Sequence, residues 1–304
     1  EDFDGAGVSR RFESLIESFN DTGRLDPRDR PKALEQISAV VRARLELSRD
    51  RARYPEIADE RITQPFFVVG AGRTGTTLMQ VLLSLGDGCR RPYSWEIRHP
   101  SPPPGLAPET EPARIAAEQR HIEDLINLAP GLLLSHPYVD AGAFMEVEDE
   151  DIFALDFHTA FPWHYTRVPI APIVHHHRET GLEEALRFHK EVLQHLQWKT
   201  PTEHWVCKTA QHYFELPATF AVYPDATVVW THRDPVVFLS SVLGIIEHFY
   251  LPHSGHRLRG PIAEQIVGGL EMGYNAVLGA DWIDDPRVVH VRFDDFVQDQ
   301  SATI

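Results

Sequence analysis

The arrangement of apolar and polar residues along the chain predicts short buried strands that alternate with amphipathic helices. Four short runs are almost entirely apolar, as is typical of strands covered on both faces. These runs are Phe66–Val69, Trp205–Cys207, Ala226–Thr231 and Val288–Phe293. Longer segments between them, such as residues 76–85, 112–129 and 183–198, repeat their apolar positions at helical spacing. Because strands that alternate with helices form βαβ units, we expect an α/β fold with a mostly parallel central sheet flanked by helices.

The first 64 residues follow a different pattern. They are polar overall, with apolar positions such as Leu15, Ile16 and Phe19 at helical spacing. We therefore predict an N-terminal helical extension over residues 1–64 and one α/β domain over residues 65–304. The last residues, Ser301–Ile304, have the pattern of a beginning helix, so we expect the C-terminal end of the domain to be incomplete.

Composition narrows the possible functions. The chain has 304 residues, of which 42% are hydrophobic and 24% charged, as in ordinary globular proteins. Its 45 acidic and 29 basic residues give a formal net charge of −16, which disfavours nucleic acid as a partner because phosphate backbones require a basic surface. No apolar run reaches membrane-spanning length, no signal peptide is recognisable, and Cys89 and Cys207 are the two cysteines of the sequence. We therefore expect a cytoplasmic enzyme with reduced thiols and no membrane span.

The clearest chemical motif follows the first apolar run. Gly70 and Gly75 stand where a phosphate-binding loop of the form G-x-x-x-x-G-K-[ST] carries its glycines. Such a loop directs backbone N–H groups at phosphate oxygens, at a helix N-terminus whose dipole favours negative charge. Thr76 replaces the lysine that reaches the β- and γ-phosphates, and Arg73 is the cation of this loop. The replacement argues against γ-phosphoryl transfer and favours a different phosphate-bearing donor.

A second candidate anion site follows the strand predicted over Ala226–Thr231. Arg233 comes shortly after this run and offers a planar fork of donors that suits a phosphate. Ser241, on a predicted helix, adds a hydroxyl group for the same oxygens. Two anion sites at separate strand ends predict a nucleotide with phosphates at both ends of its ribose.

These motifs resemble those of sulfotransferases. Gly72–Leu78 is similar to their 5′-phosphosulfate-binding loop, and Arg233–Pro235 with Ser241 is similar to their 3′-phosphate-binding motif. Further segments resemble a bacterial branch of the family, namely Pro92–Glu96, Pro102–Pro104, Phe188–Trp198 and Trp205–His212. The resemblance implies a P-loop-like sulfotransferase fold, 3′-phosphoadenosine 5′-phosphosulfate (PAPS) as the donor and no metal. The C-terminal R-K-G-x-x-G loop of cytosolic members has no counterpart in this chain.

The motif chemistry and the resemblance together suggest roles for individual residues. The donor would be bound by Gly72, Arg73, Thr74, Gly75, Thr76, Thr77, Arg233 and Ser241. Lys208, directly after a predicted strand, is expected to bring a compact cation to the bridging oxygen of the phosphosulfate. A hydroxyl acceptor also needs a proton acceptor, for which Glu96 and His212 are the two candidates. Glu96 is slightly favoured, because a tryptophan and a proline-rich turn would bury it and raise its pKa.

Two other classes of function stay open from the sequence. A P-loop nucleotide kinase or NTPase would use the same loop, although the missing lysine and the lack of an obvious magnesium-binding aspartate at a strand end count against it. A non-catalytic nucleotide-binding protein would bind the donor but tolerate replacement of Glu96 or His212. The acidic residues 146–151 and the run His175–His177 lack metal-ligand spacing, so we interpret them as a solvated face and an exposed run. No motif specifies the acceptor beyond a hydroxyl group on a small or lipid-like molecule.

Overall fold

A computed structural model describes residues 6–21, 30–159, 163–166, 181–210, 212–254 and 261–303, so His175–His177 lie outside the described residues. The elements up to residue 166 are α1 (Ala6–Asp21), α2 (Arg30–Arg53), η1 (Pro55–Asp59), β1 (Phe66–Val69), α3 (Thr76–Leu83), β2 (Cys89–Arg90), α4 (Ser94–Arg98), η2 (Pro108–Thr110), α5 (Glu111–Leu128), α6 (Leu132–Ser135), η3 (Pro137–Phe144), α7 (Asp149–Leu155) and α8 (Trp163–Thr166). The later elements are α10 (Leu182–Gln197), β3 (His204–Thr209), η4 (His212–Glu215), α11 (Leu216–Val222), β4 (Thr227–His232), α12 (Pro235–Ser254), α13 (Pro261–Val277), η5 (Asp281–Asp284), β5 (Val288–Arg292), α14 (Phe293–Gln298) and α15 (Gln300–Thr303).

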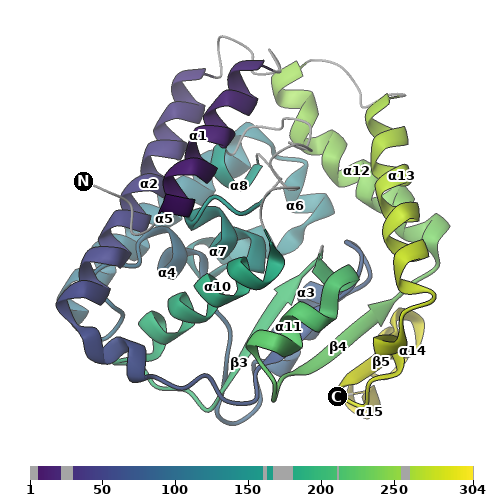
Figure 1. Cartoon of the computed structure of the whole chain (residues 1–304). Helices are drawn as coiled ribbons and strands as arrows, with labels where there is room; N and C mark the ends of the chain where they lie inside the picture. Colours follow the sequence, from purple (N-terminus) through teal and green to yellow (C-terminus); the bar gives the residue numbers. More distant parts are fainter. Residues whose placement is uncertain are drawn as a thin grey trace.

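The central sheet has five parallel strands in the order β2-β3-β1-β4-β5 (Figure 1). This confirms the predicted α/β fold, and β1, β3, β4 and β5 coincide with the four apolar runs. The remaining strand, β2, consists of Cys89 and Arg90, which is too short to produce a hydrophobic pattern. Val69 at the end of β1 is in register with Thr209 of β3 and Trp230 of β4, so the segments that follow these strands meet at one edge of the sheet.

The two faces of the sheet are covered by different helices, because alternate residues of a strand point to opposite sides. Val68 of β1 packs in one hydrophobic cluster with Met79 of α3 and Phe296 of α14. Phe67, the preceding residue, belongs to the larger cluster together with Leu193 of α10. The strands are therefore buried on both sides, which explains their continuous apolar sequence.

The N-terminal helices share this larger core. Leu15 of α1 and Leu47 of α2 belong to the same hydrophobic cluster as Phe67 of β1. α2 packs against α7 and α8, and Arg11 of α1 donates to the carbonyl oxygen of Asp156, which follows α7, at 2.9 Å. The segment predicted as a helical extension therefore contributes to the core that supports the sheet.

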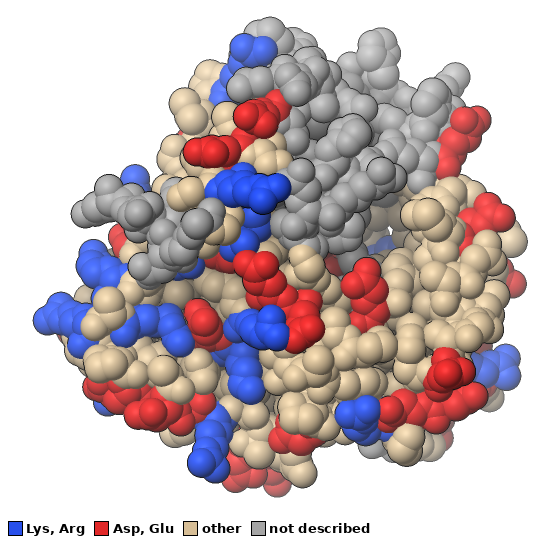
Figure 2. Space-filling view, viewed as in Figure 1, with Lys and Arg blue, Asp and Glu red and all other residues tan. Residues whose placement is uncertain are grey.

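The charged residues that the structure describes are mixed over the visible surface. On the face in Figure 2, Lys and Arg side chains are interspersed with Asp and Glu side chains, and the coloured residues form no continuous basic field. Within the described part of the chain, every helix is too short or too polar to cross a membrane.

Candidate functional site

The loop between β1 and α3 is the centre of the candidate site. Gly70 and Gly75 have φ angles of +146° and +93°, in the region that residues with a side chain rarely adopt. A Cβ atom on Gly75 would lie 2.8 Å from the ring of Phe293, so the loop packs tightly against the start of α14. Arg73 also has a positive φ angle, +74°, at a cost on the order of 1–3 kcal/mol. Backbone strain at a charged residue of a loop is typical of ligand-binding segments.

The threonines of the loop have different surroundings. The hydroxyl group of Thr74 donates to the carbonyl oxygen of Ala71 at 2.7 Å and lies 2.7 Å from the hydroxyl oxygen of Thr231 on β4. Thr74 is fully buried, and Thr76 is buried at the start of α3. Thr77 is half-buried and accepts a hydrogen bond from Lys208 Nζ at 3.3 Å. Thr74 therefore ties the loop to β4, whereas Thr77 connects it to the predicted catalytic lysine.

The two predicted anion sites meet in the structure. Arg73 donates from Nε to the hydroxyl oxygen of Ser241 on α12 at 3.0 Å, and the Arg233 guanidinium donates to the carbonyl oxygen of Arg73 at 2.9 Å. The Arg233 guanidinium also lies 4.2 Å from the centre of the Phe293 ring. Burial, and then the proximity of Arg233, lower the pKa of Arg73. No carboxylate among the described residues pairs with either guanidinium, so the two cations favour an anionic ligand.

Lys208 lies at the end of β3 and is 2% exposed. Its Nζ atom donates to Thr77 Oγ1 at 3.3 Å and to Glu148 Oε1 at 3.0 Å. Burial alone would lower the pKa of Lys208, but Glu148 and Glu146 outweigh it and raise this pKa overall. The lysine is therefore a permanent cation beside the first turn of α3, as its predicted role requires.

The acidic residues 146–151 are not a solvated face, so this sequence interpretation is wrong. Glu146, Asp149 and Glu150 are 5%, 1% and 3% exposed. Asp149 Oδ1 accepts the backbone N–H of Lys208 at 3.2 Å, and Glu150 Oε1 accepts the Thr209 hydroxyl at 2.6 Å. Buried carboxylates require such partners, and β3 supplies them. Glu148 and Asp151 form the capping box that starts α7, which marks the beginning of this helix and does not signal its burial.

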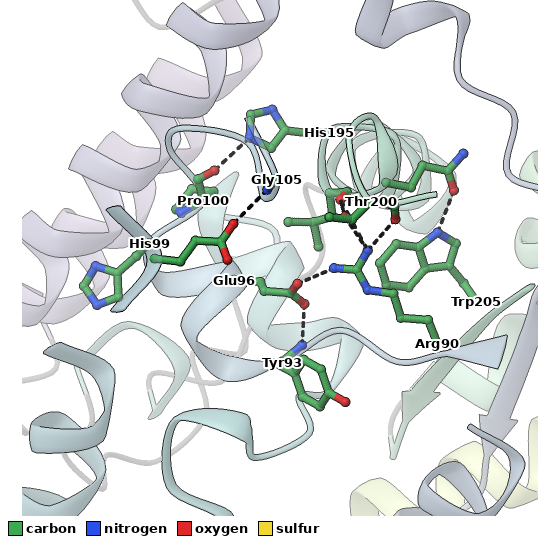
Figure 3. Close-up of polar contacts among 12 residues, drawn as sticks. Arg90, Tyr93, Glu96, His99, Pro100, Gly105, His195, Thr200 and Trp205 are labelled. Atoms are coloured by element: carbon green, nitrogen blue, oxygen red, sulfur yellow. Dashed lines mark hydrogen bonds and ion pairs between the residues drawn. The ribbon is translucent and has the colours of Figure 1, made fainter. Parts of the chain in front are cut away.

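Glu96 is buried as predicted, but its oxygens already have partners (Figure 3). One oxygen forms an ion pair with Arg90, and the other accepts the backbone N–H of Tyr93 at 3.0 Å, which caps α4. Burial raises the pKa of Glu96, and Arg90 opposes the rise. Arg90 itself lies 4.7 Å from the centre of the Trp205 ring. Glu96 thus connects α4 to β2, and its role as proton acceptor stays a prediction.

His212 begins η4, four residues after Lys208. For His212 the structure describes only the backbone, which does not test the role of the imidazole. Its role as the alternative proton acceptor therefore also stays a prediction.

Two aromatic residues, His136 and Tyr138, lie near Lys208 and Arg73. No sequence motif indicated either of them. Burial, and then the proximity of Lys208, lower the pKa of His136 to about 4. Burial raises the pKa of Tyr138, with Glu146 adding to the rise and Arg73 opposing it. The centres of these two rings lie 5.7 Å apart. Only the packing of η3 and the residue before it brings them to the site, and no pattern in the sequence marks them.

The comparisons agree with this geometry. The sulfotransferase family profile matches residues 65–304. The structure is similar to sulfotransferase STF1 from Mycobacterium tuberculosis, with a TM-score of 0.74 and 22% identity over 98% of this chain and 82% of that one. It is also similar to sulfotransferase STF9 from Mycobacterium avium, with a TM-score of 0.75 and 21% identity over 99% of this chain and 77% of that one. No curated protein shows significant sequence similarity. Because the family profile covers most of the chain, the protein belongs to the sulfotransferase family.

Proposed function

We propose that the protein transfers the sulfuryl group of PAPS to a hydroxyl group of a small or lipid-like acceptor. The observation that supports this proposal most strongly is the meeting of Arg73 and Arg233 at one loop, with Lys208 hydrogen-bonded to Thr77 at the end of that loop. Arg73 and Arg233 follow β1 and β4, Lys208 lies at the end of β3, and these strand ends lie at the same edge of the sheet. Such an arrangement suits a donor with an anionic group at each end of its ribose.

The donor would occupy the two anion sites in a defined orientation. The backbone N–H groups at the start of α3, from Gly75 to Thr77, would bind the 5′-phosphate. Arg233 and Ser241 would bind the 3′-phosphate, which ADP lacks. Arg73 belongs to the loop before α3 and contacts both Ser241 and Arg233, so it would contribute charge to both ends of the ribose.

The reaction requires a cation that stabilises the negative charge on the leaving group. The acceptor oxygen attacks sulfur in line, a new S–O bond forms, and the bond from sulfur to the 5′-phosphate oxygen breaks. The departing 3′-phosphoadenosine 5′-phosphate (PAP) carries the electron pair away as negative charge on that oxygen. Lys208, fixed by Thr77 next to the helix N-terminus, would stabilise this charge without reorganisation.

The hydroxyl proton must pass to a base, and we propose Glu146. It is buried near Lys208, and burial raises its pKa, whereas Lys208 and a backbone hydrogen bond limit the rise. A carboxylate with a raised pKa accepts a proton more readily at neutral pH than an ordinary one. Glu148 is less suitable, because it already forms the ion pair with Lys208.

Calorimetric titration of PAP and ADP tests the donor assignment. We expect micromolar binding of PAP to the unchanged protein, much weaker binding of ADP, and loss of the preference for PAP in Arg233→Ala. Arg287→Ala is the matched control, because Arg287 precedes β5 at the opposite edge of the sheet and pairs with Asp285. Equal binding of PAP and ADP, or a PAP preference that survives in Arg233→Ala, would contradict the proposal.

A further inference from the structure

His189 of α10 belongs to a buried polar chain that ends at the backbone of Lys208. Its Nδ1 atom lies 2.8 Å from the hydroxyl oxygen of Tyr223, which follows α11. Its Nε2 atom lies 3.4 Å from Asp149 Oδ1, and the same oxygen accepts the Lys208 N–H at 3.2 Å. His189, Asp149 and Tyr223 are each 1% exposed or less. The chain thus connects three helices to the residue that carries the leaving-group cation.

One tautomer satisfies every contact of this chain. With the imidazole proton on Nε2, Tyr223 donates to Nδ1, and the Nε2–H group lies 3.4 Å from Asp149 Oδ1, close to the carboxylate but outside hydrogen-bond geometry. Oδ1 of Asp149 accepts the Lys208 N–H and has the Nε2–H group of His189 beside it. Because both N–H groups are close to this oxygen, they stabilise the negative charge of Asp149 next to the end of β3.

The end of β3 requires this support because its outer edge has no strand beside it. β2 pairs with β3 only at His204 and Trp205, and no other described strand lies on that side. Asp149 therefore supplies the acceptor that a neighbouring strand would otherwise offer to Lys208. Without it, a buried N–H group would be left unsatisfied at a cost of about 1–3 kcal/mol.

A buried cysteine lies beside this chain. The ligand-type atoms of Asp149, His189 and Cys207 lie within 4.8 Å of one another. Asp149 and His189 already have protein partners, since Asp149 Oδ1 accepts the Lys208 N–H and His189 Nδ1 lies 2.8 Å from the Tyr223 hydroxyl oxygen. We therefore treat Asp149 and His189 as members of the polar chain.

We propose that His189 is a positioning residue for sulfuryl transfer, which acts through Asp149 to fix the backbone of Lys208 and hence the place of its ammonium group. This proposal rests on the proposed function, in which Lys208 stabilises the leaving group. Residues that orient a catalytic group through one intermediate commonly affect activity about 10–100-fold. An error of position matters more for the transition state than for binding of the donor, so kcat should change more than KM.

The test compares variants of the full chain. His189→Phe removes the hydrogen bond with Tyr223 and the N–H group beside Asp149, His189→Gln keeps an N–H group near Asp149, and Tyr223→Phe removes only the hydroxyl group. Val192→Ala is the matched control, since Val192 is fully buried on α10 and outside the chain. For each variant we would measure the hydrogen exchange rate of the Lys208 amide by NMR, and kcat and KM for PAPS.

We expect His189→Phe to accelerate exchange of the Lys208 amide and to lower kcat about 10–100-fold, with KM for PAPS changed much less. His189→Gln should restore most of the slow Lys208 exchange and most of kcat. Val192→Ala should lower the melting temperature but leave the Lys208 exchange rate and kcat unchanged. If the Lys208 amide exchanges as slowly in His189→Phe as in the unchanged protein, the proposal is overturned. This holds even if the protein transfers no sulfuryl group, because the exchange measurement needs no activity. Fast exchange with unchanged kcat would also overturn it, whereas an inactive unchanged protein would instead contradict the proposed function.

Discussion

The guanidinium of Arg233 donates a hydrogen bond to the backbone carbonyl oxygen of Arg73 at 2.9 Å, across 160 residues of sequence. This contact joins the loop after β1 to the turn after β4. It also fixes the carbonyl of a residue whose φ angle is positive, and so helps to stabilise a strained loop conformation. This hydrogen bond couples the two predicted anion sites, so a substitution in one site should also affect anion binding at the other.

Ser241→Ala should weaken PAP binding about 2–10-fold, because it removes the acceptor of the Arg73 Nε hydrogen bond and the hydroxyl donor that we propose for the 3′-phosphate. Ser240→Ala is the matched control, since the neighbouring Ser240 is exposed. Calorimetry of both variants with PAP measures the difference. Equal PAP affinities in the two variants would refute a role for Ser241.

Gly75→Ala should destabilise the protein by about 1–3 kcal/mol and abolish donor binding, because the loop needs a φ angle of +93° and leaves no room beside Phe293. Gly72→Ala is the control within the same loop, where a Cβ would meet Val242 at an ordinary 3.5 Å. Thermal melting with and without PAP distinguishes them. Similar melting temperatures for the two variants would show that the loop adopts another conformation.

Glu146→Gln should lower kcat by about 10²–10⁴-fold if Glu146 accepts the proton. The base works as a carboxylate, and burial raises the pKa of Glu146, so wild-type activity should fall as pH drops through that raised pKa. Glu146→Gln should remove this acidic limb of the pH–rate profile, whereas Glu96→Gln should keep it. Loss of the limb in Glu96→Gln alone would assign the base to Glu96 and contradict our proposal.

Asp156→Asn should detach the N-terminal helices at a cost of about 3–5 kcal/mol, because Arg11 and Arg44 would lose their buried carboxylate partner. Burial alone would raise the pKa of Asp156, but His158 and the two arginines lower it overall from 3.8. A lowered folded-state pKa gives stability that is complete above the unfolded value and is lost as pH falls through the folded value.

Urea unfolding of Asp156→Asn and of the unchanged protein at pH 7 and near pH 3 measures this contribution. The difference in free energy of unfolding should shrink at the lower pH. Glu183→Gln is the control, because Glu183 and Arg187 form an exposed pair that contributes at most about 0.5 kcal/mol. A difference at pH 7 no larger than that of the control would contradict the prediction.

The sequence by itself predicted four of the five strands and the two glycines with special backbone angles in the loop after β1. Strands covered on both faces must be apolar throughout, so Phe66–Val69 and three other runs were visible as a local pattern. Gly70 and Gly75 were visible because a loop with these backbone angles requires residues without a side chain at fixed positions. Such features depend on neighbours in the chain, which a sequence displays directly.

The burial and the partners of the charged residues were decided only by the tertiary structure. The acidic residues of α7 resemble a solvated face until β3 is placed beside them, where Asp149 accepts the Lys208 N–H. His189 enters the same chain from a helix distant in sequence, and Arg233 reaches Arg73 from the end of the neighbouring strand β4. Whether a charge is buried depends on which distant segment neutralises it. That pairing is set by the packing of the whole chain and leaves no local pattern in the sequence.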